Sequence, residues 1–193
     1  MALFARMYEA TLRWARHPHA PWYLAGLSFA ESSFFPVPPD VMLMPMSLAQ
    51  PQRAWRFAAI TTVASVLGGL AGYAIGYFAL ELVQPLIGEG GRWAEAYQRA
   101  SAWFREWGFW AVFIAGFSPI PYKVFTISAG ALAMAWLPFV VASGIGRGAR
   151  FFLVAGLLAW GGERMERTIR RHVETMGWLL VALAVAIYLM FRN

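Results

Sequence analysis

The chain has 193 residues, of which 60% are hydrophobic and only 13% are charged, whereas an average soluble domain is nearer half apolar and a quarter charged. The absence of cysteine excludes disulfides, thiolate metal sites and cysteine nucleophiles. The formal net charge of +6 fits the flanking cations of a membrane protein, so we expect no nucleic acid partner. The composition therefore predicts an all-α integral membrane protein, with residues 1–193 forming a single membrane domain.

The first 50 residues predict two elements that do not cross the membrane fully. Residues 1–17 mix apolar side chains with arginines, which predicts an amphipathic helix lying at the membrane interface. Residues 20–50 are apolar, but their second half contains Pro36, Pro38, Pro39 and Pro45. Each proline removes a backbone donor and clashes with the preceding helical turn. We therefore expect a re-entrant helical hairpin over 20–50, with Pro36 and Pro38 shaping its broken tip.

The next segment predicts the clearest transmembrane helix of the chain, over residues 54–80. No charged residue interrupts the 24 residues from Phe57 to Leu80, a length sufficient to cross the hydrocarbon core. Glycines recur there at helical spacing and predict a face on which another helix packs closely; they are Gly68, Gly69, Gly72 and Gly76. Residues 81–107 are polar and rich in tryptophan, which predicts an amphipathic extramembrane loop that contains an amphipathic helix.

The second half of the chain repeats this pattern. Residues 108–135 are an apolar run broken by Pro119 and Pro121, which predicts a second re-entrant hairpin. Three further segments complete the prediction: a transmembrane helix over 136–160, a charged cytoplasmic segment over 163–174, and a C-terminal transmembrane helix over 176–192.

The two hairpins and the helices after them predict an internal repeat. Pro36-Val37-Pro38 aligns with Pro119-Ile120-Pro121 at a shift of 83 positions, because Pro119 is 83 residues after Pro36. The distribution of Lys and Arg between the loops predicts a cytoplasmic amino terminus, so the two hairpins would enter from opposite sides of the membrane. Such an inverted repeat is typical of secondary transporters, whose substrate site lies near the midplane where broken helices meet.

Five ionisable residues lie within the apolar segments: Glu31, Asp40, Lys123, Arg147 and Arg150. Each costs about 3 kcal/mol or more in hydrocarbon, so a charge inside the membrane is by default a functional hypothesis. The excess of one cation suits a phosphate headgroup, for which arginine offers a bidentate contact and lysine a point charge. We predict that Lys123, Arg147 and Arg150 bind this headgroup, and that Glu31 and Asp40 take up and release protons.

A structural alternative exists for the same charges. Asp40 with Lys123, and the arginines with their own partners, would then only tether the hairpins to the long helices, with nothing bound between them. Enzymatic roles are weaker, because His17, His19 and His172 all lie in predicted extramembrane segments. No intramembrane Ser/His pair or three-ligand metal site can form from them, so we expect no catalysis, no metal and no cofactor.

Three segments are similar to motifs of a known family: Glu31–Asp40, Gly116–Phe125 and Gly146–Phe151. Together they resemble the DedA family, the bacterial branch of the VTT-domain (SNARE-associated Golgi protein) superfamily. The resemblance implies two re-entrant hairpins facing each other and movement of lipids across the bacterial inner membrane, including recycling of undecaprenyl phosphate. It also implies functional acidic positions at Glu31 and Asp40, since some members take part in proton-dependent homeostasis.

The sequence departs from the family pattern at the second hairpin, around which the family commonly has arginines. Here Gly116 and Ser118 stand near the first of these positions and Lys123 takes the second, and lysine does not reproduce a bidentate contact. The main hypothesis is a flippase-like or scramblase-like transporter of an anionic, phosphate-bearing lipid, either undecaprenyl phosphate or a phospholipid, coupled to protons. The alternatives are a proton/cation antiporter and a non-transporting membrane-organising protein. The sequence leaves the oligomeric state open.

Overall fold

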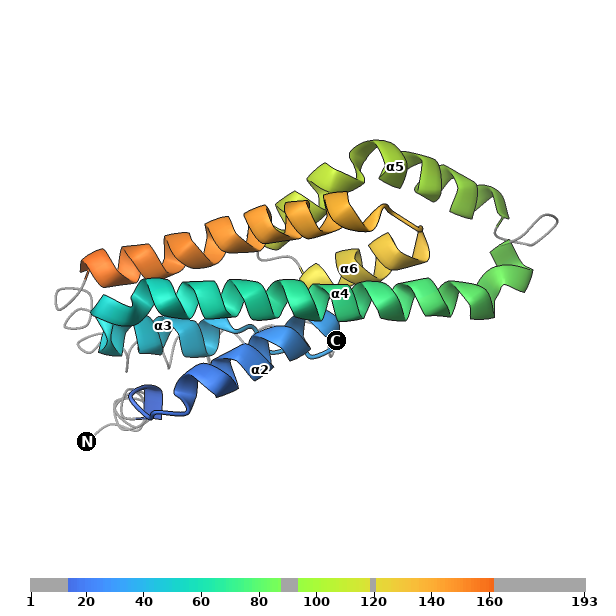
Figure 1. Ribbon diagram of the computed structural model, residues 1–193. Coiled ribbons are helices and arrows are strands. Elements are labelled where there is room, and N and C mark those ends of the chain that lie inside the picture. Colours follow the sequence, from blue (N-terminus) through green and yellow to red (C-terminus); the bar gives the residue numbers. More distant parts are fainter. Residues whose placement is uncertain (1–13, 88–93, 119–120, 162–193) are drawn as a thin grey trace, which may run out of the picture.

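The computed structural model describes residues 14–87, 94–118 and 121–161, and all regular elements within these ranges are helices (Figure 1). They are, in chain order, α2 (Ala20–Ser33), α3 (Asp40–Ala49), the short 3-10 helix η1 (Pro51–Arg53), α4 (Ala54–Ile87), α5 (Ala94–Phe117), α6 (Tyr122–Ala131) and a last helix, Trp136–Gly161. Most of the predicted interfacial helix at 1–17 and the predicted segments 163–174 and 176–192 lie outside the described residues.

Two helices are long and apolar enough to cross a membrane, Pro51–Leu80 and Trp136–Gly161. They coincide with the two transmembrane helices predicted over 54–80 and 136–160. α4 itself has 34 residues, which at 1.5 Å per residue gives about 51 Å, well beyond a hydrocarbon core of about 30 Å. Large apolar side chains such as Trp22 and Trp160 are 77% and 82% exposed, as expected for surfaces that face lipid.

The first half of α4 packs against α2, and the two helices run parallel. The Ser28 hydroxyl donates to the carbonyl of Thr61 at 2.8 Å, and the Ser33 hydroxyl donates to the carbonyl of Gly68 at 2.8 Å. A Cβ atom on Gly68 would clash with the backbone of Phe29. Small residues and hydroxyl groups thus bring the two backbones into close contact, as in membrane helix pairs.

The second half of α4 packs against α6 in the same manner. A Cβ atom on Gly76 would clash with the backbone of α6, and a Cβ atom on Gly130 would clash with the backbone of α4. α2 and α6 therefore lie end to end along α4, and the Thr126 hydroxyl joins them by donating to the carbonyl of Ser32 at 3.2 Å. The glycine face predicted from the sequence is the face on which both helices pack.

The last helix packs against the other two helices, α5 and α3, in a similar way. A Cβ atom on Gly146 would clash with the backbone of Phe113, so the end of α5 lies directly against the first half of this helix. Leu43 of α3 belongs to the same buried cluster as Phe151 and other residues of the second half. α4 thus packs against α2 and α6, and the last helix packs against α5 and α3.

The structure has two pairs of helices separated by short breaks, as the prolines predicted. Residues 34–39 separate α2 from α3, and residues 118–121 separate α5 from α6. In Figure 1 the first pair lies beside the end where α4 begins and the second pair extends toward its other end. Pro36 and Pro38 of the first break and Pro121, just before α6, line one cavity.

One predicted boundary falls inside a helix. The loop over 81–107 and the hairpin over 108–135 were expected to meet at residue 108, but α5 continues from Ala94 to Phe117 and α4 extends to Ile87. Gly108 lies inside α5 and does not end it. A Cβ there would lie 2.8 Å from the Phe104 side chain, one turn earlier in the same helix, and 3.2 Å from the Met134 side chain.

The helix contacts predict a stability difference between two glycine variants. Gly76→Ala should destabilise the protein by about 1–3 kcal/mol, the usual cost of overpacking, because the new methyl group clashes with the α6 backbone. Gly144→Ala is the matched control, since a Cβ there meets nothing within 4 Å and alanine favours the helix. Thermal unfolding in detergent measures both. Equal melting temperatures for the two variants would contradict the close packing of α4 with α6.

Candidate functional site

The two breaks enclose a cavity of about 260 Å³ in the middle of the molecule. It is lined by Glu31, Phe35, Pro36, Pro38, Pro39, Asp40, Pro121, Lys123, Arg147 and Arg150. All five ionisable residues selected from the sequence are therefore in one place, together with three of the four tip prolines. The fourth, Pro119, lies outside the described residues.

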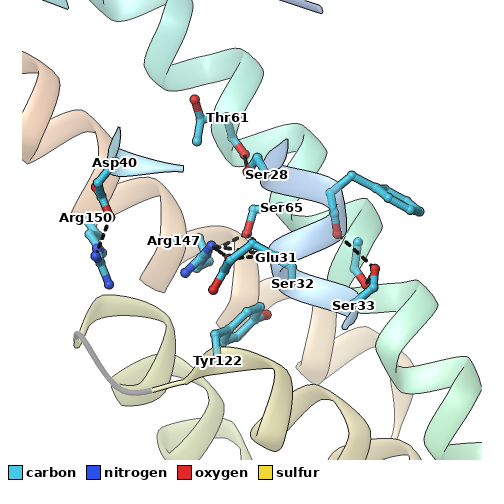
Figure 2. Close-up of polar contacts among 12 residues, drawn as sticks. Ser28, Glu31, Ser32, Ser33, Asp40, Thr61, Ser65, Tyr122, Arg147 and Arg150 are labelled. Atoms are coloured by element: carbon cyan, nitrogen blue, oxygen red, sulfur yellow. Dashed lines mark hydrogen bonds and ion pairs between the residues drawn. The ribbon is translucent and has the colours of Figure 1, made fainter. Parts of the chain in front are cut away.

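Arg147 is the most buried charge of the site, with 2% of the residue exposed. Its Nη2 forms an ion pair with Glu31 of α2 and lies 3.3 Å from the Ser32 hydroxyl, and its Nε donates to the Ser65 hydroxyl of α4 at 2.5 Å (Figure 2). A buried ion pair is tolerated only when further hydrogen bonds satisfy its polar atoms. Arg147 therefore fastens the last helix to α2 and α4 at once.

Aromatic rings cover the faces of this guanidinium. Its central carbon lies 4.8 Å from the centre of the Tyr122 ring and 4.7 Å from the centre of the Phe151 ring, within the range of cation–π attraction. The Tyr122 hydroxyl donates in turn to the hydroxyl of Ser143, which fixes the ring. With its planar faces and two of its nitrogens engaged, Arg147 is well suited to hold helices together.

Arg150 lies one turn further along the same helix and has a less enclosed environment. Its Nη2 donates to Asp40 Oδ2 at 2.6 Å and its Nη1 donates to the carbonyl of Ser118 at 2.8 Å. The Arg150 and Asp40 side chains are 20% and 17% exposed. The other carboxylate oxygen, Asp40 Oδ1, is buried and has no hydrogen-bond partner among the described residues, so one strong acceptor of the site is unused.

Lys123 forms no ion pair with any residue in the described ranges, and its Nζ lies 3.4 Å from the carbonyl oxygen of Phe34. The pairing of Asp40 with Lys123 that we considered from the sequence does not form. Asp40 is the first residue of α3, and α3 packs along the last helix, which places its carboxylate beside Arg150 instead. Each arginine forms an ion pair with a carboxylate, and each of these two pairs is formally neutral. Lys123 therefore gives the cavity a formal net charge of +1.

Sequence reasoning missed the hydroxyl groups that support these charges. Besides contacting Arg147, Ser32 and Ser65 share a hydrogen bond of 2.7 Å between α2 and α4. A signal was present, since Ser28 and Ser32, and Thr61 and Ser65, are spaced four residues apart and therefore lie on one face of each helix. Polar faces of this kind are typical of contacts between membrane helices.

The buried pair makes a testable prediction. Glu31→Gln and Arg147→Met should each lower the free energy of unfolding by about 3–5 kcal/mol, because each leaves one buried charge without its partner. The double variant should lose clearly less than the sum of the two. Thermal unfolding of the four proteins in detergent gives the coupling energy, and strictly additive losses would show that the two side chains do not depend on each other.

Comparisons with known proteins agree with the resemblance noted in the sequence. The family model for the VTT domain matches residues 37–160. The chain is 48% identical to an uncharacterized protein of Haemophilus influenzae and 45% identical to an uncharacterized protein of Histophilus somni, in both cases over the full length of both chains. No solved structure matches it significantly.

A third relative has a functional name. The chain is 37% identical over 92 residues to undecaprenyl phosphate transporter A of Staphylococcus aureus, an alignment that covers 45% of each chain. Because the family model covers well over half of the sequence, and two full-length relatives are closely similar, the chain belongs to the VTT domain family, which includes the DedA proteins.

Proposed function

We propose that this protein moves a phosphate-bearing lipid, either undecaprenyl phosphate or a phospholipid, across the bacterial inner membrane in a proton-coupled cycle. The observation that supports this most directly is the central cavity, where three cations and two carboxylates line the meeting point of two proline-broken helix pairs. Ionisable residues within membrane segments are rare and by default mark the pathway of a substrate or ion.

The position of the cavity supports a transport role. Ser65 is at the middle of the span Pro51–Leu80, and Arg147 is close to the middle of the span Trp136–Gly161. Because Arg147 donates to Ser65, the site lies halfway along both long helices, and in a membrane it would be near the midplane. Substrate sites of secondary transporters are found at this depth, between the tips of broken helices.

The helix arrangement is consistent with the inverted repeat that we propose. α4 packs against α2 from the first helix pair and then α6 from the second, while the last helix packs against α5 from the second pair and then α3 from the first. Under an exchange of the two halves of the chain, α2 corresponds to α5, α3 to α6 and α4 to the last helix, so these pairings with the two long helices support the proposal. In this proposal the pairs are re-entrant hairpins that enter from opposite sides, with the amino terminus in the cytoplasm.

The chemistry of the cavity favours phosphate over a neutral or cationic substrate. Lys123 has no carboxylate partner among the described residues, and Arg150 has both an exposed edge and a guanidinium fork that fits phosphate oxygens. A phosphate that reaches Lys123 would compete with Asp40 for Arg150. The name of the S. aureus relative points to the same group, a phosphate on a long apolar chain.

Protonation of Asp40 would couple this competition for Arg150 to the uptake and release of a proton. When its carboxylate is protonated, the ion pair with Arg150 loses its negative partner, and the guanidinium becomes available to the phosphate. When the proton leaves, Asp40 regains Arg150 and displaces the phosphate. Glu31 is the second candidate for proton uptake, but its partner Arg147 is held by two rings and a serine, so its release would rearrange the helix contacts as well.

Lipid movement in proteoliposomes tests the proposal. Lys123→Gln should slow flipping of a fluorescent phospholipid or of polyprenyl phosphate roughly tenfold or more, because a charge-assisted contact to phosphate is worth about 1.5–3 kcal/mol. Arg56→Gln is the matched control, since it removes an exposed cation that does not line the cavity. If the wild-type protein flips neither lipid under any gradient, lipid transport is excluded.

The response to pH tests the role of Asp40 separately. A proton gradient should change the flipping rate of the wild-type protein, and Asp40→Asn should remove this response, because an amide does not ionise as a carboxyl group does. The rate is measured with the gradient in each direction and without one. Proton flux that is stimulated by cations and occurs without lipid flipping would instead indicate an antiporter.

A further inference from the structure

A second cavity, of about 500 Å³, lies between α5 and the end of α6. It is lined by Tyr97, Gln98, Ser101, Ala102, Arg105, Leu132 and Ala133. Ser101 is 17 residues before Ser118, whose carbonyl contacts Arg150 at the central cavity. At 1.5 Å per residue this is a separation of about 25 Å along α5, so the second cavity is a separate site.

The Ser101 hydroxyl has an unusual environment. The residue is 6% exposed, and its hydroxyl oxygen is buried without a hydrogen-bond partner among the described residues. A helical serine or threonine usually donates to the carbonyl four residues earlier, as Ser33 does to Phe29 and Thr61 does to Phe57. Ser101 forgoes this bond. Its hydroxyl is therefore an unused hydrogen-bonding group in the wall of the cavity.

The other polar groups of the cavity are mostly donors. Arg105 lies one turn after Ser101, has an exposed side chain, and forms no ion pair with the residues that the structure describes. The Tyr97 hydroxyl donates to the carbonyl of Ala131 at 3.1 Å, which fixes one wall, and Gln98 adds an amide. Within the described ranges, no carboxylate lines the cavity. A guanidinium, a hydroxyl and an amide around one space favour an anion.

The surroundings favour an anion that belongs to a lipid. Exposed tryptophans follow the outer surface of the same helix: Trp103, Trp107 and Trp110 are 52%, 48% and 53% exposed. Tryptophan is enriched at headgroup depth in membrane proteins. We propose that this cavity binds the phosphate of a phospholipid headgroup, with Arg105 as the charged contact and the Ser101 hydroxyl as the buried one.

Photo-crosslinking with a defined probe tests the location. The full-length protein is reconstituted with phosphatidylglycerol that has a photoreactive headgroup, and labelled peptides are mapped by mass spectrometry. We expect labelling around Ser101 and Ala133, and Arg105→Gln should reduce it about tenfold or more, the effect of losing one charge-assisted contact. Arg99→Gln, an exposed arginine of α5 that does not line the cavity, should leave the labelling unchanged.

Ser101→Ala distinguishes ligand binding from a structural role. Removing a hydroxyl that has no partner should leave the lipid-free protein equally stable or more stable in detergent, because the buried orphan group costs free energy. The same variant should bind the lipid more weakly. A melting temperature that falls in the absence of lipid would show that Ser101 has a structural partner, and would overturn its assigned role.

Two further measurements test whether the second cavity selects a lipid and whether it is independent of the central cavity. Inorganic phosphate that competes as strongly as the lipid would show that the second cavity takes a free anion, and would overturn the headgroup assignment. Lys123→Gln, at the central cavity, should slow flipping but leave labelling near Ser101 intact. If labelling near Ser101 is lost in Lys123→Gln, the two cavities are not independent and the proposal fails.

Discussion

The structure depends on the burial of one charge, the guanidinium of Arg147, in the middle of an apolar helix bundle. A charge in that position is stable only when every polar atom finds a partner. Glu31 provides the counter-charge, Ser65 a hydrogen bond, and the rings of Tyr122 and Phe151 cover the faces. These partners come from α2, α4, α6 and the last helix itself, so satisfying one residue fixes the relative positions of four helices.

Arg150 is only three residues away, yet its situation differs. Arg147 is enclosed, whereas Arg150 shares a partly exposed pair with Asp40, one of whose oxygens is unused. A single helix thus presents one enclosed arginine and one that is partly exposed at the cavity. In the proposed cycle, Arg147 holds the helices together and Arg150 binds the substrate.

The sequence was sufficient to predict the helix–break–helix pairs, both long helices and the gathering of the five charges. Prolines and uninterrupted apolar runs act locally, so their effects can be read along the chain. The ion-pair partners could not be predicted in this way. Asp40 pairs with Arg150, 110 residues away, because of the register in which α3 packs along the last helix. The close approach of Gly108 in α5 to Met134, 26 residues later, is likewise a tertiary contact that local patterns do not show.

The two buried clusters of the protein have a consequence for how it is made. The first cluster combines residues such as Leu24 and Leu43 with Phe151 and Ala155, and the second combines residues such as Val112 and Phe139 with Leu70 and Tyr73 packed against them. Each cluster therefore draws on both halves of the chain, and neither half has a complete core. During synthesis the first half is therefore made before the residues of the second half that complete its buried clusters. Because both halves belong to one polypeptide, they are always made in equal amounts and next to each other.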